Sequence, residues 1–324
     1  MEENLFEKGI KLEDFDKCHF NEYVDVPVNN THRFDMILGY VTPWNGRGYD
    51  VAKNHAKRFT HISPCWFTLN SKYVLEGIKD VDRGWLRDLK KENNDLKVFP
   101  RIRLNVQDVN KALRNSKWQN KFRNVLKKFD GFVLDVGGHD VSTNVLSQFL
   151  NSIHQPVIIA GSYRALQPQK VREFQSMEFI VKFQVYMYDY APPINAPIKW
   201  IEEMLHMYRD QGVAGKVLAG MNWYGYRKSV GDTQAIIGTS LLESIAEDKG
   251  HMSVKWAKTV AEHRIDQKFR DPFTHKRKIT SYHYPTPFSI LARLEVIKRY
   301  GSGVAIWELG QGLGCFPNLY FVDK

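Results

Sequence analysis

The fold can be inferred outward from one short segment, Phe129-Asp130-Gly131-Phe132-Val133-Leu134-Asp135-Val136-Gly137-Gly138. Its apolar residues favour a buried strand, which the Asp130-Gly131 turn begins and Gly137-Gly138 ends. A carboxylate inside a buried strand costs free energy unless it has a partner. The segment therefore predicts one strand of a barrel, with Asp135 as a residue whose presence requires an explanation.

Similar apolar runs recur along the chain and are separated by segments with helical spacing. We expect the other strands at 36–41, 59–63, 96–102, 157–160, 179–187, 216–221 and 304–307. The expected helices include 51–58, 83–92, one capped by Asp108 and 197–209, and a last one with Thr286 as cap, Pro287 first and Gly301 just past its end. Eight mostly apolar strands alternating with helices predict an α/β fold, a (β/α)8 TIM barrel.

The spacing between the seventh strand and the last helix is too long for one crossover, at about 60 residues. We expect a small α+β insertion at 227–283, with a helix at 241–245, strands at 253–256, 264–269 and 278–283, and a turn at Asp271-Pro272. The barrel would then comprise 34–226 and 284–324. Residues 1–33 are polar and are expected to form an irregular N-terminal extension.

The composition is that of a soluble globular protein, with 324 residues, 43% of them hydrophobic and 25% charged. No apolar run approaches the roughly 20 residues of a membrane-spanning helix, so no membrane insertion is expected. The first residues are acidic and do not form a signal peptide as written. The net charge of +10 is spread along helix-like segments, which we interpret as solvated surface and not as a nucleic-acid site.

The three cysteines, Cys18, Cys65 and Cys315, have no metal-ligand spacing and cannot all pair internally. We expect at most one disulfide together with a buried thiol. Neither a metal nor another cofactor is predicted.

The expected strand ends are rich in aromatic residues, and in a barrel the carboxyl ends of the strands form the site. Aromatic faces with polar rims suit the C–H faces of sugar rings. Phe67 and Tyr186 are more typical of packing, and Asp189 is equally suited to tying a loop to backbone amides. The predicted ligand-binding residues are Tyr40, Trp44, Trp66, Asp135, Tyr188, Asp189, Asn222, Trp223, Tyr224 and Trp307.

From about residue 35 onward the chain resembles glycoside hydrolase family 18, the chitinases and chitinase-like lectins. The resemblance is carried by 38–45 (LGYVTPWN), 48–51 (GYDV), 80–85 (DVDRGW), 195–197 (NAP) and 306–313 (IWELGQGL). By resemblance, Tyr40 and Trp44 match the family's tyrosine and tryptophan of the first strand and loop. Tyr188 and Asp189 match its tyrosine-aspartate pair after strand six, and Trp307 matches the tryptophan that forms the floor of the central sugar subsite. The chain departs from the family at Asn222, where chitinases usually have proline.

The resemblance also implies that the catalytic acid is missing. The family motif D-G-x-D-x-D-x-E maps onto Asp130, Gly131, Val133, Asp135 and Gly137. In the family the glutamate protonates the glycosidic oxygen and the middle aspartate steadies the intermediate. Without that proton donor the reaction forfeits a factor of roughly 10²–10⁴. Asp140, past two glycines, is not expected to replace it.

The resemblance therefore favours a protein that is not an enzyme: an inactive chitinase-like lectin for chito-oligosaccharides or other N-acetylated glycans. Two alternatives remain: an interaction scaffold for a scavenger-receptor-type protein, and a weak hydrolase using a non-standard acid. By resemblance the location would be secreted or lysosomal, and a cytoplasmic location stays open.

Overall fold

The computed structural model describes residues 8–20, 31–271 and 275–322. Parallel strands form a ring of eight positions, in which β17 pairs with β2 and closes the circle. The strands are β2 (Ile37–Val41), β3 (His61–Pro64), β7 (Arg101–Leu104), β8 (Phe132–Gly137), β9 (Val157–Gly161), β10 (Ile180–Tyr186), β11 (Val217–Asn222) and β17 (Gly303–Trp307). The (β/α)8 barrel expected from the sequence is confirmed.

Two positions of the ring are each built from two short strands. The chain breaks after β3 and resumes as β4 (Phe67–Leu69), and β6 (Lys97–Val98) is separated from β7 by Phe99-Pro100. Because β3 pairs with β6 while β4 pairs with β7, the ring stays continuous across both breaks. Two further strand pairs lie at the edges, β4 with β5 (Leu75–Glu76) and β1 (Thr31–His32) with β18 (Phe321–Val322).

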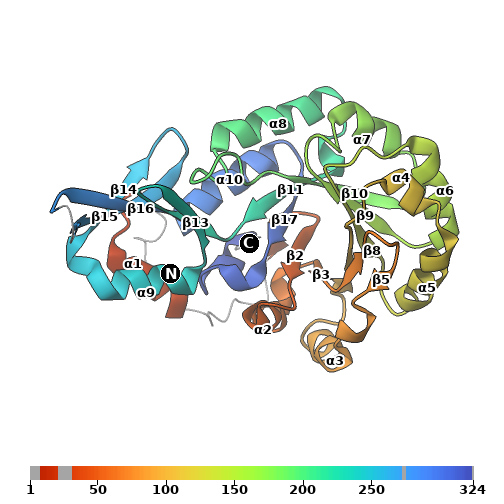
Figure 1. Cartoon of the computed structure of the whole chain (residues 1–324), viewed down its shortest axis with the longest axis horizontal. Helices are drawn as coiled ribbons and strands as arrows, with labels where there is room; N and C mark the ends of the chain where they lie inside the picture. The colour runs from red at the N-terminus through yellow and green to blue at the C-terminus, as the bar shows by residue number, and fades with distance from the viewer. Residues whose placement is uncertain (1–7, 21–30, 272–274, 323–324) are drawn as a thin grey trace.

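Helices cover the outside of the ring (Figure 1). They are α2 (Gly46–Asn54), α3 (Arg83–Glu92), α4 (Val109–Leu113), α5 (Ser116–Leu126), α6 (Thr143–Ile153), α7 (Pro168–Phe174), α8 (Ile198–Asp210) and α10 (Pro287–Arg299). Short 3-10 turns lie at Ala56–Arg58, Ile78–Asp80, Ala214–Lys216, Lys249–His251, Leu309–Gln311 and Phe316–Tyr320. No helix in the described part of the chain is both long and apolar enough to cross a membrane.

The helix expected after Asp108 is in fact two helices. The Asp108 side chain accepts a hydrogen bond from the Lys111 N–H and caps α4, but α4 ends at Leu113. Asn115 then caps α5 by accepting from the Lys117 N–H. A second capping residue so close to the first starts a new helix because its side chain competes for the backbone N–H groups.

The last helix, α10, begins and ends where the sequence predicts. Thr286 and Ser289 form a reciprocal capping box, and Pro287 occupies the first turn. Gly301 follows the helix with φ of +70°, a conformation that glycine adopts without steric cost. This expectation is confirmed.

The alternation of side chains along each strand divides the core into two layers. In β8, Phe132, Leu134 and Val136 point outward and pack beneath the helices. Val133 points inward and packs in the barrel interior with Tyr40 and other residues. Asp135 has the same parity as Val133, so its carboxylate is directed into the barrel.

A five-stranded antiparallel sheet follows β11, in the order β13-β12-β16-β15-β14, and lies to one side of the barrel (Figure 1). Its elements are β12 (Gly225–Ser229), β13 (Asp232–Ile236), α9 (Gly238–Asp248), β14 (Met252–Ala257), β15 (Glu262–Arg270) and β16 (Arg277–His283). The three predicted strands and the predicted helix are present, whereas the β12–β13 hairpin was not predicted. Pro272 of the expected turn lies outside the described residues.

The N-terminal segment differs from the irregular extension that its polarity predicts. Residues 12–20 form α1 (Leu12–Phe20), and Phe15 is buried on its inner face. A disulfide joins Cys18 to Cys315, and a salt bridge of 3.1 Å joins Glu13 to Lys249 beyond α9. The helix forms because a few apolar residues at helical spacing find a partner surface that the segment alone does not reveal. The expected single disulfide and buried thiol are confirmed.

Cys65, the remaining thiol, is buried in the barrel interior, and this burial raises its pKa to about 11. At pH 8 about one thiol in a thousand would be ionised. We therefore expect the Cys65 thiol to react hardly at all with an aromatic disulfide reagent in the native state. After unfolding in urea, one thiol per chain should react, measured by the absorbance of the thiolate that the reagent releases. A Cys65→Ser variant should remain unreactive in both states, and rapid labelling of the native wild-type protein would contradict this burial.

Candidate functional site

A cleft of about 300 Å³ opens at the carboxyl ends of the barrel strands. Its lining comes from β2, β7, β8, β10 and β17 and from the segments that follow β10 and β11. Six of the predicted ligand-binding residues line it: Tyr40, Asp135, Tyr188, Asp189, Tyr224 and Trp307. It is also lined by Arg101, Arg103, Gly137, Gln184 and Tyr186.

Asp135 is the buried acid at the centre of the cleft, and its carboxylate is fully engaged. The Arg101 guanidinium donates to Oδ2 through Nε at 2.7 Å and through Nη2 as well. Oδ1 accepts from the Tyr186 hydroxyl and, at 2.9 Å, from the Gly137 N–H. The Asp135 carboxylate is paired with a guanidinium and accepts hydrogen bonds on both oxygens. These contacts compensate the free energy that burying an isolated charge would cost.

The floor of the cleft is aromatic, and Arg101 supports it. The guanidinium carbon of Arg101 lies 5.2 Å from the Trp307 ring centroid, which is within the range of a cation–π contact. The Tyr40 ring lies 5.5 Å from the Trp307 ring, and the Tyr40 hydroxyl donates to Gln184 Oε1 at 2.7 Å. These contacts fix the orientation of the indole before any ligand is present.

The opposite wall of the cleft is built around Asp189, which follows β10. Its Oδ1 accepts hydrogen bonds from the hydroxyls of Tyr224 and Tyr226. Burial, followed by the hydrogen bond to Asp189, raises the pKa of both phenols, that of Tyr226 to about 12, so both stay neutral donors. Asp189 itself has φ of +59°, and its N–H donates to Asn195 Oδ1 at 2.8 Å.

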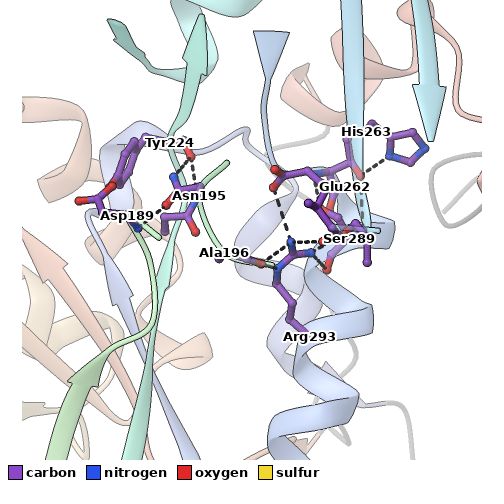
Figure 2. A network of polar contacts seen from close by, with 12 residues as sticks. Asp189, Asn195, Ala196, Tyr224, Glu262, His263, Ser289 and Arg293 are labelled. Atoms are coloured by element: carbon purple, nitrogen blue, oxygen red, sulfur yellow. Dashed lines mark hydrogen bonds and ion pairs between the residues drawn. The ribbon is translucent and has the colours of Figure 1, made fainter. Parts of the chain in front are cut away.

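Arg293 of α10 lies behind this wall (Figure 2). Its guanidinium donates to the Ala196 carbonyl at 2.6 and 2.9 Å, next to Asn195, and to the carbonyls of Val260, Ala261 and Ser289. Glu262, buried at the start of β15, lies 3.8 Å from Nη2. One side chain thus joins the Asp189 loop, the inserted sheet and the last barrel helix.

The backbone at Gly137 is unusual. Its φ is +58°, in the left-handed region, and the pairing of β8 with β9 shifts register between Asp135 and Gly137. A Cβ at this position would meet no atom within 4 Å, so the constraint on side chains here comes from the backbone and not from crowding.

Four of the predicted ligand-binding residues do not line the cleft. Trp66 is buried in the core, and its Nε1 donates to the Tyr49 hydroxyl at 2.7 Å. Trp223 is fully buried and packs on Phe316. It continues the alternation of β11 in which Ala219 and Met221 point outward from the barrel, so its side chain faces the outer core. Asn222 is buried, and its Nδ2 donates to the Tyr224 carbonyl. Trp44 is 69% exposed on the segment after β2.

The sequence did not lead us to Arg101, Arg103 and Gln184 as cleft residues, and the expectation that Tyr186 only packs is wrong, because Tyr186 lines the cleft and donates to Asp135. A signal for them was present, since each alternates with an outward apolar residue: Arg101 and Arg103 with Ile102 and Leu104, and the β10 pair with Phe183, Val185 and Met187. Because alternate side chains of a strand point to opposite faces, following this alternation to the strand ends places these four side chains inside the barrel. Phe67, by contrast, is core.

Two carboxylates are present among the residues that line the cleft, and both accept hydrogen bonds, Asp135 from Arg101 and Asp189 from two tyrosines. Asp140 points away into solvent and forms a salt bridge with Lys170 at 3.4 Å. Across the described residues, no group of three or more His, Cys, Asp or Glu could hold a metal ion. The cleft is thus suited to stacking and hydrogen bonding.

Comparison with solved structures identifies the architecture. A chitinase from Chromobacterium violaceum aligns over 88% of this chain and 97% of its own, with a TM-score of 0.68 and 16% identity. The fold is that of the chitinases. The spore cortex-lytic enzyme SleL of Bacillus megaterium aligns over 98% of this chain and 83% of its own, with a TM-score of 0.69 and 17% identity.

A third relative by structure is a GH18 chitinase from Cycas revoluta in complex with (GlcNAc)3. It aligns over 88% of this chain and 98% of its own, with a TM-score of 0.66 and 11% identity. No family model matches the sequence. At these identities the agreement concerns the fold.

Proposed function

We propose that the protein is a catalytically inactive lectin of the glycoside hydrolase family 18 type, which binds chito-oligosaccharides or other N-acetylated glycans in the barrel cleft. The observation that carries the proposal is the state of Asp135. It is held by Arg101 and Tyr186 next to Gly137, the position of the family glutamate by resemblance, while Trp307 and Tyr40 form an aromatic floor. Such a cleft favours binding over proton transfer.

Three further observations support the proposal. A structural neighbour from Cycas revoluta was solved with (GlcNAc)3. Within family 18, the quoted motifs resemble those of chitinase domain-containing protein 1, and we infer that the chain is a protein of that type. The Cys18–Cys315 disulfide supports an oxidising compartment, in keeping with a secreted or lysosomal location. A receptor partner stays a prediction.

Isothermal titration with chitotetraose tests the binding. Replacing Trp307 by alanine removes the stacking floor, so we expect the dissociation constant to rise about 10- to 100-fold, which equals about 1.4–2.7 kcal/mol. The matched control is Trp200→Ala on α8, where the indole packs on Tyr190, outside the cleft lining. Equal affinities of the two variants, or no heat with the wild-type protein, would refute the lectin proposal.

A fluorogenic chitobioside tests the absence of catalysis. We expect no release of fluorophore above that of a heat-denatured sample. Steady turnover that is lost in an Asp135→Asn variant would overturn the proposal and identify a hydrolase.

A further inference from the structure

A second hollow, of about 610 Å³, lies beside the cleft on the inserted sheet. Its floor is one face of β12, β16 and β15, and one rim is the Pro193-Ile194 turn that follows Asp189. Tyr226 at the start of β12 donates its hydroxyl to Asp189 of the cleft, so a hydrogen bond links the strand under this hollow to the cleft. The lectin proposal makes no use of this second hollow.

The pairing of the strands shows which side chains share this face. Tyr226, His283 and Arg264 are opposite one another across β12, β16 and β15, and Lys228, Ser281 and Asp266 form the next row. Tyr282 and Ile265, which alternate with these residues, are buried in the hydrophobic core. Side chains in one such row are about 5 Å from their neighbours, close enough to contact one small ligand together.

The face carries more positive than negative charge. Lys255 is opposite Arg264 in the pairing of β14 with β15, so these two rows hold Lys228, Arg264 and Lys255 against Asp266. Asp266 already accepts from Arg264 Nη2 at 2.8 Å and lies 3.7 Å from Lys255 Nζ. Among the described residues, Lys228 has no carboxylate within ion-pair distance, and the buried Arg264 Nε has no hydrogen-bond partner.

The remaining lining is suited to a sugar. The Ser281 hydroxyl and the His283 imidazole offer hydrogen bonds, and Ile279 and Val230, which are 53% and 71% exposed, offer apolar contact. Burial lowers the pKa of His283 to about 4, so the imidazole is neutral at pH 7 and can both donate and accept.

We propose that this hollow binds a sugar unit that carries an acidic group, a carboxylate or a sulfate, with Lys228 and Arg264 contacting the anion. A guanidinium and an ammonium group are donors that match an oxyanion, and an acidic ligand repays their desolvation where a neutral sugar does not. The site is distinct from the Trp307 cleft and accepts the acidic unit whether or not a neutral glycan occupies the cleft.

Titration with a hyaluronan hexasaccharide tests the proposal for carboxylates, and 6-O-sulfated chitotetraose tests it for sulfates. Lys228→Ala should weaken binding of the acidic ligand about three- to tenfold, the effect of one partly exposed charge-assisted hydrogen bond, and leave neutral chitotetraose unchanged. The matched control is Arg227→Ala, its neighbour in β12, which removes the same charge from the opposite face.

The outcomes separate the two proposals. Selective loss in Lys228→Ala with either acidic ligand supports the acidic-sugar site, even if chitotetraose fails to bind and the lectin proposal falls. Equal weakening by Lys228→Ala and Arg227→Ala would show a general charge effect and overturn the site. The absence of binding to both acidic ligands would overturn it as well, whatever the result with chitotetraose.

Discussion

Replacing Arg293 by methionine is expected to lower the free energy of unfolding by about 3–5 kcal/mol, which is the usual effect of removing one partner of a buried charged pair. The Arg293 side chain is 4% exposed, and its loss leaves Glu262 without a cation and the carbonyls of Ala196, Val260 and Ala261 without this donor. With about 2 cal/mol/K of unfolding entropy per residue, the melting temperature should fall by roughly 4–7 °C in differential scanning calorimetry.

The pH dependence gives a second measurement on the same variant. Burial raises the pKa of Glu262, while Arg293 opposes that rise. A carboxyl with a raised folded pKa contributes stability below its unfolded pKa and loses it as the pH rises through the folded value. Without Arg293 the folded pKa rises further, so the variant should lose more stability between pH 5 and pH 8 than the wild type does.

The double variant Arg293→Met/Glu262→Met is the matched control. It removes the stranded carboxylate, so we expect it to recover part of the loss and to show a flatter pH profile than Arg293→Met. A decrease of less than about 1 kcal/mol for Arg293→Met would contradict the role assigned to Arg293.

Replacing Arg101 by methionine is the second change with a large expected effect, this time on binding. The substitution removes the cation from Asp135 and the support beneath the Trp307 ring, so chitotetraose should bind at least about 30-fold more weakly, equal to about 2 kcal/mol. Titration calorimetry measures the affinity, and thermal unfolding shows whether the variant is folded at the temperature used.

Two other variants separate charge from geometry at this position. Arg101→Lys keeps the positive charge but loses the forked contact with Asp135, so an intermediate affinity is expected. Arg103→Ala removes a cation from an exposed position in the same cleft and should have a smaller effect. Wild-type affinity in Arg101→Met would show that neither the Asp135 pair nor the Trp307 contact prepares the cleft.

The barrel could be predicted because most of its strands are continuous apolar runs, which are recognisable without knowledge of their neighbours. The last helix could also be predicted, because Thr286 and Pro287 are typical of a helix start and Gly301 is typical of the position just after a helix end. The β12–β13 hairpin escaped prediction because its strands are polar and exposed, and Gly231 at φ +76° was its main turn signal. Helix α1 escaped because its stability depends on packing and on a disulfide to a residue far along the chain.

The site could be predicted only where we considered which face of its strand each side chain occupies. Tyr40, Asp135 and Trp307 were placed in the cleft by strand-end position and by resemblance. Trp66 and Trp223 lie at similar positions in the sequence but face the core. Arg101 was overlooked because an arginine within a barrel strand is explained only once its partner, Asp135, is known to lie on the neighbouring strand, diagonally from it.

The backbone at Gly137 has a consequence for the history of the protein. If the protein is the inactive lectin proposed here, a Gly137→Glu mutation would restore the family's residue. It would place an L side chain at φ of +58°, which costs about 1–2 kcal/mol. It would also face an Asp135 already committed to Arg101 and a valine at position 133. On this proposal, a return to catalysis would therefore require changes at more than one position, because a new glutamate at position 137 would meet an unfavourable backbone and an Asp135 already paired with Arg101.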